Sequence, residues 1–215
     1  MKALALCLLA FCLVAGCSRS EPVSEISVDG SQPVVPVEGS NFGPDDWPFW
    51  RGPARNGLAQ IDNVPTSWDE NNNIVWKVDV PGRGHASPTV LGDRIFLATA
   101  DEDAGTQSVI CFDRNDGHQL WQSTVHNGGL PGSLGHQKST HASSTVATDG
   151  ERVFASFLNG DAIWVTALDL EGAQLWQTKV GPFDSSYGYA ASPAIFKSFV
   201  IVAADHNGGG FVAAL

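Results

Sequence analysis

Residues 143–180, SSTVATDGERVFASFLNGDAIWVTALDLEGAQLWQTKV, decide the fold, because most of their pattern also occurs in residues 87–125, SPTVLGDRIFLATADEDAGTQSVICFDRNDGHQLWQSTV. Each copy holds four short apolar runs separated by turn residues. The pairs Gly92-Asp93 and Asp149-Gly150 tolerate the positive φ of a tight hairpin. Each copy therefore predicts a sheet of four antiparallel strands.

A third copy begins at Ser192 and reaches Leu215 without the turn and the tryptophan that close the other two. The copies begin 56 and 49 residues apart, a spacing typical of propeller blades. Residues 74–80 match only the last strand of a copy, so we expect an outer strand there. The predicted fold is all-β, an incomplete β-propeller of four-stranded antiparallel blades at 87–125 and 143–180 with a truncated blade at 192–215.

The charge balance of the chain excludes some partners. The 12 lysines and arginines are outnumbered by 23 aspartates and glutamates, which gives a formal net charge of −11. Nucleic acids and anionic lipid head groups both require clustered cations, so we expect no nucleic-acid partner. The 23 glycines and 12 prolines suit a turn-rich all-β domain.

The first 17 residues predict export. Residues 1–16 have one lysine, an apolar stretch and small residues before Cys17, as a signal peptide does. The sequence LVAGC at residues 13–17 resembles the lipobox of exported bacterial lipoproteins, which implies cleavage before Cys17 and acylation of that cysteine. We then expect a membrane-anchored lipoprotein on the periplasmic side or at the cell surface, with residues 17–46 as a flexible tether. The alternative is an ordinary secretory signal in which Cys17 has no role.

After export, Cys17 and Cys111 are the two cysteines of the mature chain, so no disulfide framework is expected. Cys111 stands where the other copy has Ala167, which predicts a small buried residue.

The turns before the repeated tryptophans are similar to a known family. FDRNDGHQLW at residues 112–121 and LDLEGAQLW at residues 168–176 resemble the Ala-x-Asp-x-x-Thr-Gly-x-x-x-Trp repeat of pyrroloquinoline quinone (PQQ)-like β-propellers. The opening WPFWRGPARNG at residues 47–57 looks like the start of exported propellers in that superfamily. Asp116 and Glu171 replace the usual threonine.

The resemblance covers residues 47–215 and implies a ring of seven or eight blades. We therefore expect that the chain is a fragment of a longer product or that it needs partners to close, and that its open flank from Ser192 onward associates. The resemblance also implies that the repeated tryptophan docks on the neighbouring blade and that Asp and Gly shape the turn. The structural repeat residues are Trp76, Asp113, Gly117, Trp121, Asp169, Gly172 and Trp176.

Histidines at the starts of the innermost strands are the candidate ligand contacts. His85 and His141 occupy equivalent places in the two copies, and inner strands begin at the mouth of the central channel. We expect both to contact a ligand there together with Tyr189, near which Tyr187 also lies. The alternative is that they only fix loops by hydrogen bonding.

Other polar clusters predict no chemistry. His126, His136 and His141 lie on a glycine-rich insertion whose spacing matches no metal motif, so we expect exposed loop histidines. Residues 101–105 begin like a calcium loop but lack its later acids, which indicates a hairpin tip. The aromatic stretch 47–58 is interpreted as a cap on the first sheet, with a binding surface as the alternative.

Two functions remain open. The first is a non-catalytic extracytoplasmic scaffold without cofactor, which binds a protein or a glycan. The second is implied by the resemblance: a quinoprotein dehydrogenase with PQQ and Ca²⁺, for which an adjacent cysteine pair, calcium ligands, an aspartate base and a tryptophan floor are expected. The sequence has no adjacent cysteine pair.

Overall fold

The computed structural model describes residues 42–59, 61, 64–132, 134 and 138–215. The predicted signal peptide, Cys17, most of the predicted tether and His136 lie outside these residues. Among the described residues, no helix has the length and apolar character needed to cross a membrane.

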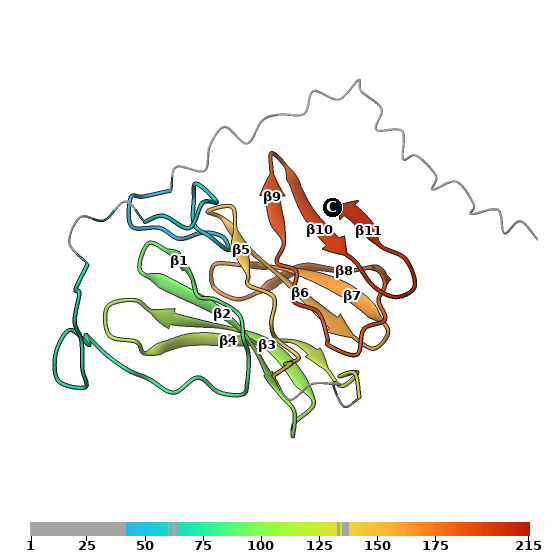
Figure 1. Ribbon diagram of the computed structural model, residues 1–215, viewed down its shortest axis with the longest axis horizontal. Helices are drawn as coiled ribbons and strands as arrows, with labels where there is room; N and C mark the ends of the chain where they lie inside the picture. The colour runs from blue at the N-terminus through green and yellow to red at the C-terminus, as the bar shows by residue number, and fades with distance from the viewer. Residues whose placement is uncertain (1–41, 60, 62–63, 133, 135–137) are drawn as a thin grey trace, which may run out of the picture. The chain divides into compact units, whose positions relative to one another are not determined.

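The first repeat forms a sheet of four antiparallel strands in the order β1-β2-β3-β4 (Figure 1). Its strands are β1 (Thr89–Leu91), β2 (Arg94–Asp101), β3 (Thr106–Asp113) and β4 (Gln119–Asn127). The hairpin between β1 and β2 turns at Gly92, whose φ is 55°. Only glycine adopts this left-handed conformation without cost, so the turn forms where the sequence predicts it.

The second repeat forms the same sheet in the order β5-β6-β7-β8. Its strands are β5 (Ala147–Thr148), β6 (Arg152–Asn159), β7 (Ala162–Asp169) and β8 (Gln174–Pro182). The third repeat forms a sheet of three strands in the order β11-β10-β9. Its strands are β9 (Ala194–Phe196), β10 (Phe199–Ala204) and β11 (Phe211–Ala214). The predicted all-β fold with four-stranded blades is confirmed.

Hydrophobic cores join neighbouring sheets face to face. The first core combines Phe96 and Val109 of the first sheet with Val153 of the second sheet and Val146, which directly precedes β5. A second core joins the second and third sheets and includes Ile163 and Val202, both fully buried. Because both faces of β3 and β7 are covered, these strands are buried over almost their whole length.

The repeated tryptophan crosses from one sheet to the next. The indole Nε1 of Trp121 on β4 donates a hydrogen bond of 3.0 Å to the carbonyl oxygen of Leu170, in the turn of the second sheet. Gly172 in that turn has φ +88°, and a Cβ there would lie 2.7 Å from Trp121 Cδ2. The glycine is therefore required both by the backbone conformation and by the approach of the ring.

Residues 74–80 differ from the prediction, because they form no strand. Trp76 still docks on the first sheet, where its Nε1 donates to the carbonyl oxygen of Arg114 at 2.8 Å. A strand is defined by ladder pairing, and no described strand pairs with this segment. The predicted outer strand at residues 74–80 is therefore not formed.

Candidate functional site

Residues 42–57 form a strap that contacts the free edges of all three innermost strands. Trp47 and Val90 of β1 exchange two backbone hydrogen bonds, of 2.9 and 3.0 Å. The amide of Thr148 on β5 donates to the carbonyl oxygen of Pro48 at 3.0 Å, and Arg55 Nη2 donates to the carbonyl oxygen of Ile195 on β9. Figure 1 shows this segment in blue beside β1 and β5. The predicted cap on the first sheet thus reaches two further sheets.

The strap begins before Trp47. Asp46, which the sequence assigned to the tether, is 9% exposed, and its Oδ1 accepts a hydrogen bond of 2.7 Å from the amide of Gly92. Arg55 stacks over the ring of Phe49, 4.7 Å from its centroid. The strap therefore holds the three inner strands in place. It also occupies the free strand edges with which an extended ligand would pair.

The two predicted channel-mouth histidines lie beyond the strap, before the inner strands. His85 is exposed, and its amide donates to the carbonyl oxygen of Ala142 at 3.0 Å. The side chain of His141 is 9% exposed, and its Nε2 lies 3.9 Å from Oε1 of Glu102. Arg83 Nη1 lies 3.8 Å from the same carboxylate oxygen. The carboxylate of Glu102 thus lies between the side chains of His141 and Arg83.

Burial lowers the pKa of His141; Glu102 opposes this shift, and Arg83 adds to it. The imidazole is therefore neutral at pH 7 and able to accept or donate a hydrogen bond.

The side chain of Tyr189 lies in the core between the second and third sheets. Its hydroxyl donates to the carbonyl oxygen of Ala203 at 3.1 Å, and its ring packs edge-on against Phe183 with centroids 5.3 Å apart. Burial raises its pKa to about 12. Tyr189 therefore stabilises the interface of two sheets, whereas Tyr187 is the exposed tyrosine of this loop.

His126 is a strand residue, which corrects the expectation of an exposed loop histidine. It lies near the end of β4 and is 9% exposed. Its ring packs edge-on against Phe157 and Trp164 of the second sheet, with centroid distances of 6.1 and 5.8 Å. Among the described residues its Nε2 has no hydrogen-bond partner, and burial lowers its pKa to about 4. The sequence does not show which strands pack against His126, so it could not predict that this side chain is buried among apolar neighbours.

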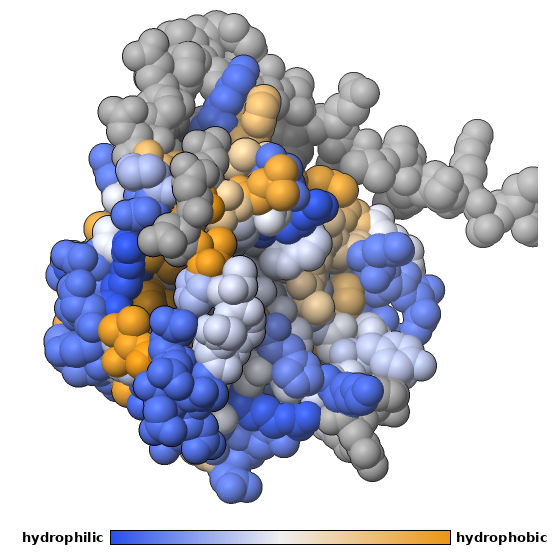
Figure 2. Space-filling model, turned by 60° about the vertical axis from the view of Figure 1, so that its left-hand side comes forward, coloured by the Kyte–Doolittle hydropathy of each residue, from blue (hydrophilic) through white to orange (hydrophobic). Residues whose placement is uncertain are grey.

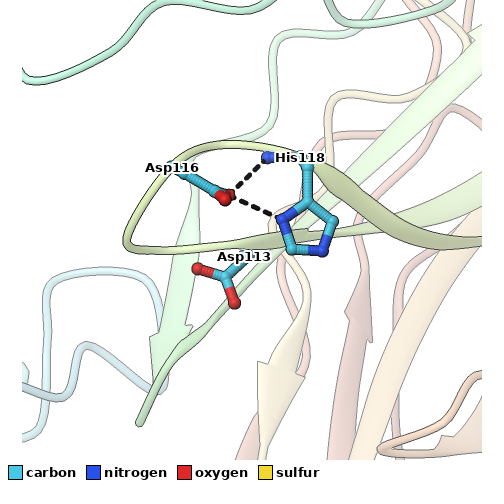
Figure 3. A group of neighbouring side chains, drawn as sticks. All are labelled: Asp113, Asp116 and His118. Atoms are coloured by element: carbon cyan, nitrogen blue, oxygen red, sulfur yellow. Dashed lines mark hydrogen bonds and ion pairs between the residues drawn. The ribbon is translucent and has the colours of Figure 1, made fainter.

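One group of potential metal ligands is found among the described residues, at the turn between β3 and β4. Asp113, Asp116 and His118 lie together there (Figure 3). Asp116 Oδ1 accepts hydrogen bonds from the amide and from Nδ1 of His118, at 3.0 and 2.6 Å. The amide hydrogen bond and then the imidazole lower the pKa of Asp116, and the same carboxylate raises the pKa of His118.

Asp113 Oδ1 accepts a hydrogen bond of 2.7 Å from the amide of Asn115. Asp169 does the same in the second sheet, accepting from Glu171 and Ala173 at 3.1 and 2.7 Å. These aspartates shape the turn, as side chains that accept from amides two residues on commonly do.

The described residues do not fit a calcium–quinone site. Ca²⁺ takes six to eight oxygen ligands. The Asp113 turn carries two carboxylates that are already hydrogen-bonded to amides, and at His141 the one carboxylate within ion-pair distance is Glu102. Cys111 is the one described cysteine, fully buried, with its pKa raised to about 12 by burial. We therefore assign no cofactor to these residues.

This geometry defines the class of protein. Separate antiparallel sheets that pack face to face, the first connected to the second by the indole of Trp121, are the blades of a β-propeller. The chain belongs to the family described as outer membrane protein assembly factor BamB, whose model matches residues 58–214. The predicted resemblance to PQQ-like propellers is confirmed.

The chain is similar to solved structures, one of which has a TM-score above 0.5. The quinohemoprotein alcohol dehydrogenase from Comamonas testosteroni is 17% identical with a TM-score of 0.54, over 79% of this chain and 25% of that one. BamB from Moraxella catarrhalis is 22% identical with a TM-score of 0.44, over 66% and 43%. A europium-containing methanol dehydrogenase is 21% identical with a TM-score of 0.47, over 62% and 23%. The chain thus spans less than half the length of each, and no curated protein matches it by sequence.

Proposed function

We propose that the protein is a non-catalytic scaffold outside the cytoplasm that presents its loops and the channel mouth at His85 and His141 to a protein or glycan partner. The observation that carries the proposal is the strap. Residues 47–55 take up the inner edges of three sheets, so the chain's own backbone occupies the place where a ligand on the axis would bind. The family description, which names an assembly factor of the outer membrane, supports the same function.

The partner surface is tested by placing a photo-crosslinking amino acid at His85 in intact cells. Glu171, an exposed residue on the turn between β7 and β8, is the matched control position. We expect a discrete crosslinked species from His85 that is absent from Glu171. Equal crosslinking from both positions would contradict a partner site at the channel mouth.

The competing function is a PQQ-dependent dehydrogenase. Purified protein is incubated with PQQ, Ca²⁺ and primary alcohols, and reduction of an electron-accepting dye is followed. The scaffold proposal expects no turnover above that of heat-denatured protein. Sustained turnover that depends on PQQ would replace the scaffold by the enzyme.

The location also has a direct test. We propose acylation at Cys17, which would hold the domain at a membrane through the segment that precedes Phe42. Labelled palmitate should enter the wild-type chain and not the Cys17→Ser variant. Equal labelling of both chains, or none, would remove the lipid anchor.

A further inference from the structure

A cavity of about 380 Å³ lies among segments of all three sheets. Its lining comes from the segment after β4, the hairpin of β6 and β7, the end of β8 with the segment that follows, and the loop after β10: Pro131, Leu158, Asp161, Pro182, Asp184 and His206. The amide of Phe183 donates to the carbonyl oxygen of Asp161 at 2.8 Å, and the amide of Asp184 donates to Nδ1 of His206 at 3.3 Å. The cavity is therefore bounded by segments that are hydrogen-bonded to one another.

The cavity lies at the same end of the sheets as the predicted channel mouth. Adjacent strands are antiparallel, so β2 and β4 end where β1 begins, and β6 and β8 end together in the second sheet. His85 precedes β1, and Glu102 follows β2. The first two sheets meet at this end, because the amide of Gly160 donates to the carbonyl oxygen of Gly129, which follows β4. The cavity and the candidate histidines therefore belong to one end of the protein.

Carboxylates outnumber cations at this end. Arg83 lies 3.8 Å from Glu102, and Lys179 lies 3.2 Å from Asp161, so these two cations are already paired. The carboxylates that have no ion pair among the described residues are exposed on the tip between β2 and β3 and on the loops after β8 and β10: Asp101, Asp103, Asp184 and Asp205. Figure 2 shows hydrophilic side chains at the lower end of the molecule, where Figure 1 places the tip between β2 and β3. Such a surface attracts a cationic partner and repels an anionic one.

The walls of the cavity are apolar, whereas its rim carries the charge. Pro131, Leu158 and Pro182 line it, and Leu158 is 7% exposed. Lysine and arginine side chains bury their hydrocarbon stems along apolar surface and keep the charged head where it is solvated or paired. Apolar walls beside the exposed carboxylate of Asp184 therefore fit a long basic side chain.

The other polar groups of the cavity do not suit an anion or a sugar. Nδ1 of His206 accepts hydrogen bonds from the amides of Asp184 and Gly208, at 3.3 and 3.2 Å, so the ring proton is on Nε2 and the ring adds no positive charge. Sugars are commonly bound on the exposed face of an aromatic ring. Phe183 is 8% exposed, and its ring packs against those of Tyr189 and His206, so it presents no such face.

On the basis of the proposed function, we propose that this cavity receives a lysine or arginine side chain of a protein partner. The stem packs against Pro131, Leu158 and Pro182, and the cationic head pairs with the carboxylate of Asp184. The volume of about 380 Å³ is near the lower end of the range of about 300–1,000 Å³ for ligand sites, as one side chain requires. The partner is then a protein segment that carries basic residues.

The test is a titration of the isotope-labelled chain with an acetylated Gly-Gly-Arg-Gly-Gly peptide, followed through the amide chemical shifts of the protein. The matched probe has citrulline in place of arginine, which keeps the shape of the head and removes its charge. We expect saturable shifts at residues 158–161, 182–185 and 206 with the arginine peptide and none there with the citrulline peptide. No saturable shift with arginine, or equal shifts with both peptides, would overturn the proposal.

Two charge-removing variants separate the cavity from the general charge of this end. Asp184→Asn should raise the Kd of the arginine peptide about fivefold, as the loss of an exposed ion pair does. Asp205→Asn is the matched control, because Asp205 is also exposed at this end but does not line the cavity, and its effect on the Kd should stay below about twofold. Equal weakening by both variants would mean that the peptide is held by general attraction and would refute the cavity.

An oligosaccharide of four glucose units is the competing probe. It should leave the shifts of residues 158–161 and 182–185 unchanged. Shifts there with the oligosaccharide and not with the arginine peptide would make the occupant a glycan and overturn the proposal.

The crosslink at His85 is an independent result. A partner crosslinked at His85 without arginine binding in the cavity would refute the basic side chain and leave the proposed function standing. Arginine binding without that crosslink would support the cavity and count against the partner site at the channel mouth.

Discussion

Protonation of His126 should destabilise the folded protein, because this imidazole is buried against Phe157 and Trp164 with no partner for its Nε2 among the described residues. The unfolded chain binds the proton with the ordinary pKa of about 6.5, whereas the folded chain binds it with a pKa of about 4. A folded pKa below the unfolded one means that stability is complete above pH 6.5 and is lost as the pH falls toward 4.

The size of the loss follows from the two pKa values. Each pKa unit corresponds to about 1.4 kcal/mol, so the full difference is about 3 kcal/mol and about 2.5 kcal/mol of it is lost by pH 4.5. Other groups titrate in this range, and a variant is needed to isolate His126. His126→Phe keeps an aromatic ring in the same core and removes the titration.

The assay is urea unfolding of wild type and His126→Phe at pH 7.5 and pH 4.5, followed by tryptophan fluorescence. The wild type should lose about 2.5 kcal/mol more than the variant between the two pH values. His118→Gln is the control, because His118 is exposed and its pKa is raised rather than lowered. Parallel losses in wild type and His126→Phe would refute the reasoning.

Three further changes test the interfaces between sheets. Gly172→Ala should destabilise the protein by about 2–4 kcal/mol, since a Cβ would meet Trp121 and the φ is positive. Gly105→Ala is the control and should cost only about 1–2 kcal/mol, because its φ is +70° but nothing lies within 4 Å of a Cβ. Equal melting temperatures of the two variants would contradict the close approach of Trp121 to Gly172. Cys111 should resist alkylation until urea unfolds the chain, as judged by peptide mass mapping, and fast labelling of folded protein would show that it is not buried. Arg55→Met should raise amide exchange at the start of the third sheet and leave the first sheet unchanged, because the side chain of Arg55 donates its hydrogen bond to Ile195 of the third sheet. Uniform changes would count against this anchor.

The sheets themselves are readable from the sequence because both copies carry the same local signals. Gly92 and Gly117 mark turns whose φ values are positive in the structure, and Trp121 recurs at the spacing that brings its indole onto the next sheet. These features depend on residues close in sequence. Local chemistry therefore specifies the blade.

The features that the sequence did not reveal depend on contacts between distant segments. His126 becomes buried because Phe157 and Trp164, more than thirty residues later, pack against it. The strap joins residues before position 58 to three separate strands. Such contacts follow from how the sheets are arranged, which no single stretch of the chain encodes.

The candidate site, too, could be predicted only in part from the sequence. The equivalence of His85 and His141 was read from aligned copies, and both lie before the inner strands. Tyr189 directly precedes Ala190, which holds the equivalent place in the third copy, but its hydroxyl is directed to Ala203 in the core. Position along the chain did not reveal the direction of that side chain.

The measurement that tests the central claim most directly is nuclear magnetic resonance of the chain with isotope-labelled tryptophan. If the repeats are separate blades joined by their tryptophans, the Hε3 proton of Trp121 gives cross-peaks to the α protons of Gly172. The indole N–H of Trp121 exchanges slowly with solvent, since it is hydrogen-bonded to Leu170. A rapidly exchanging Trp121 indole without contacts to the second repeat would mean that the sheets do not pack as blades.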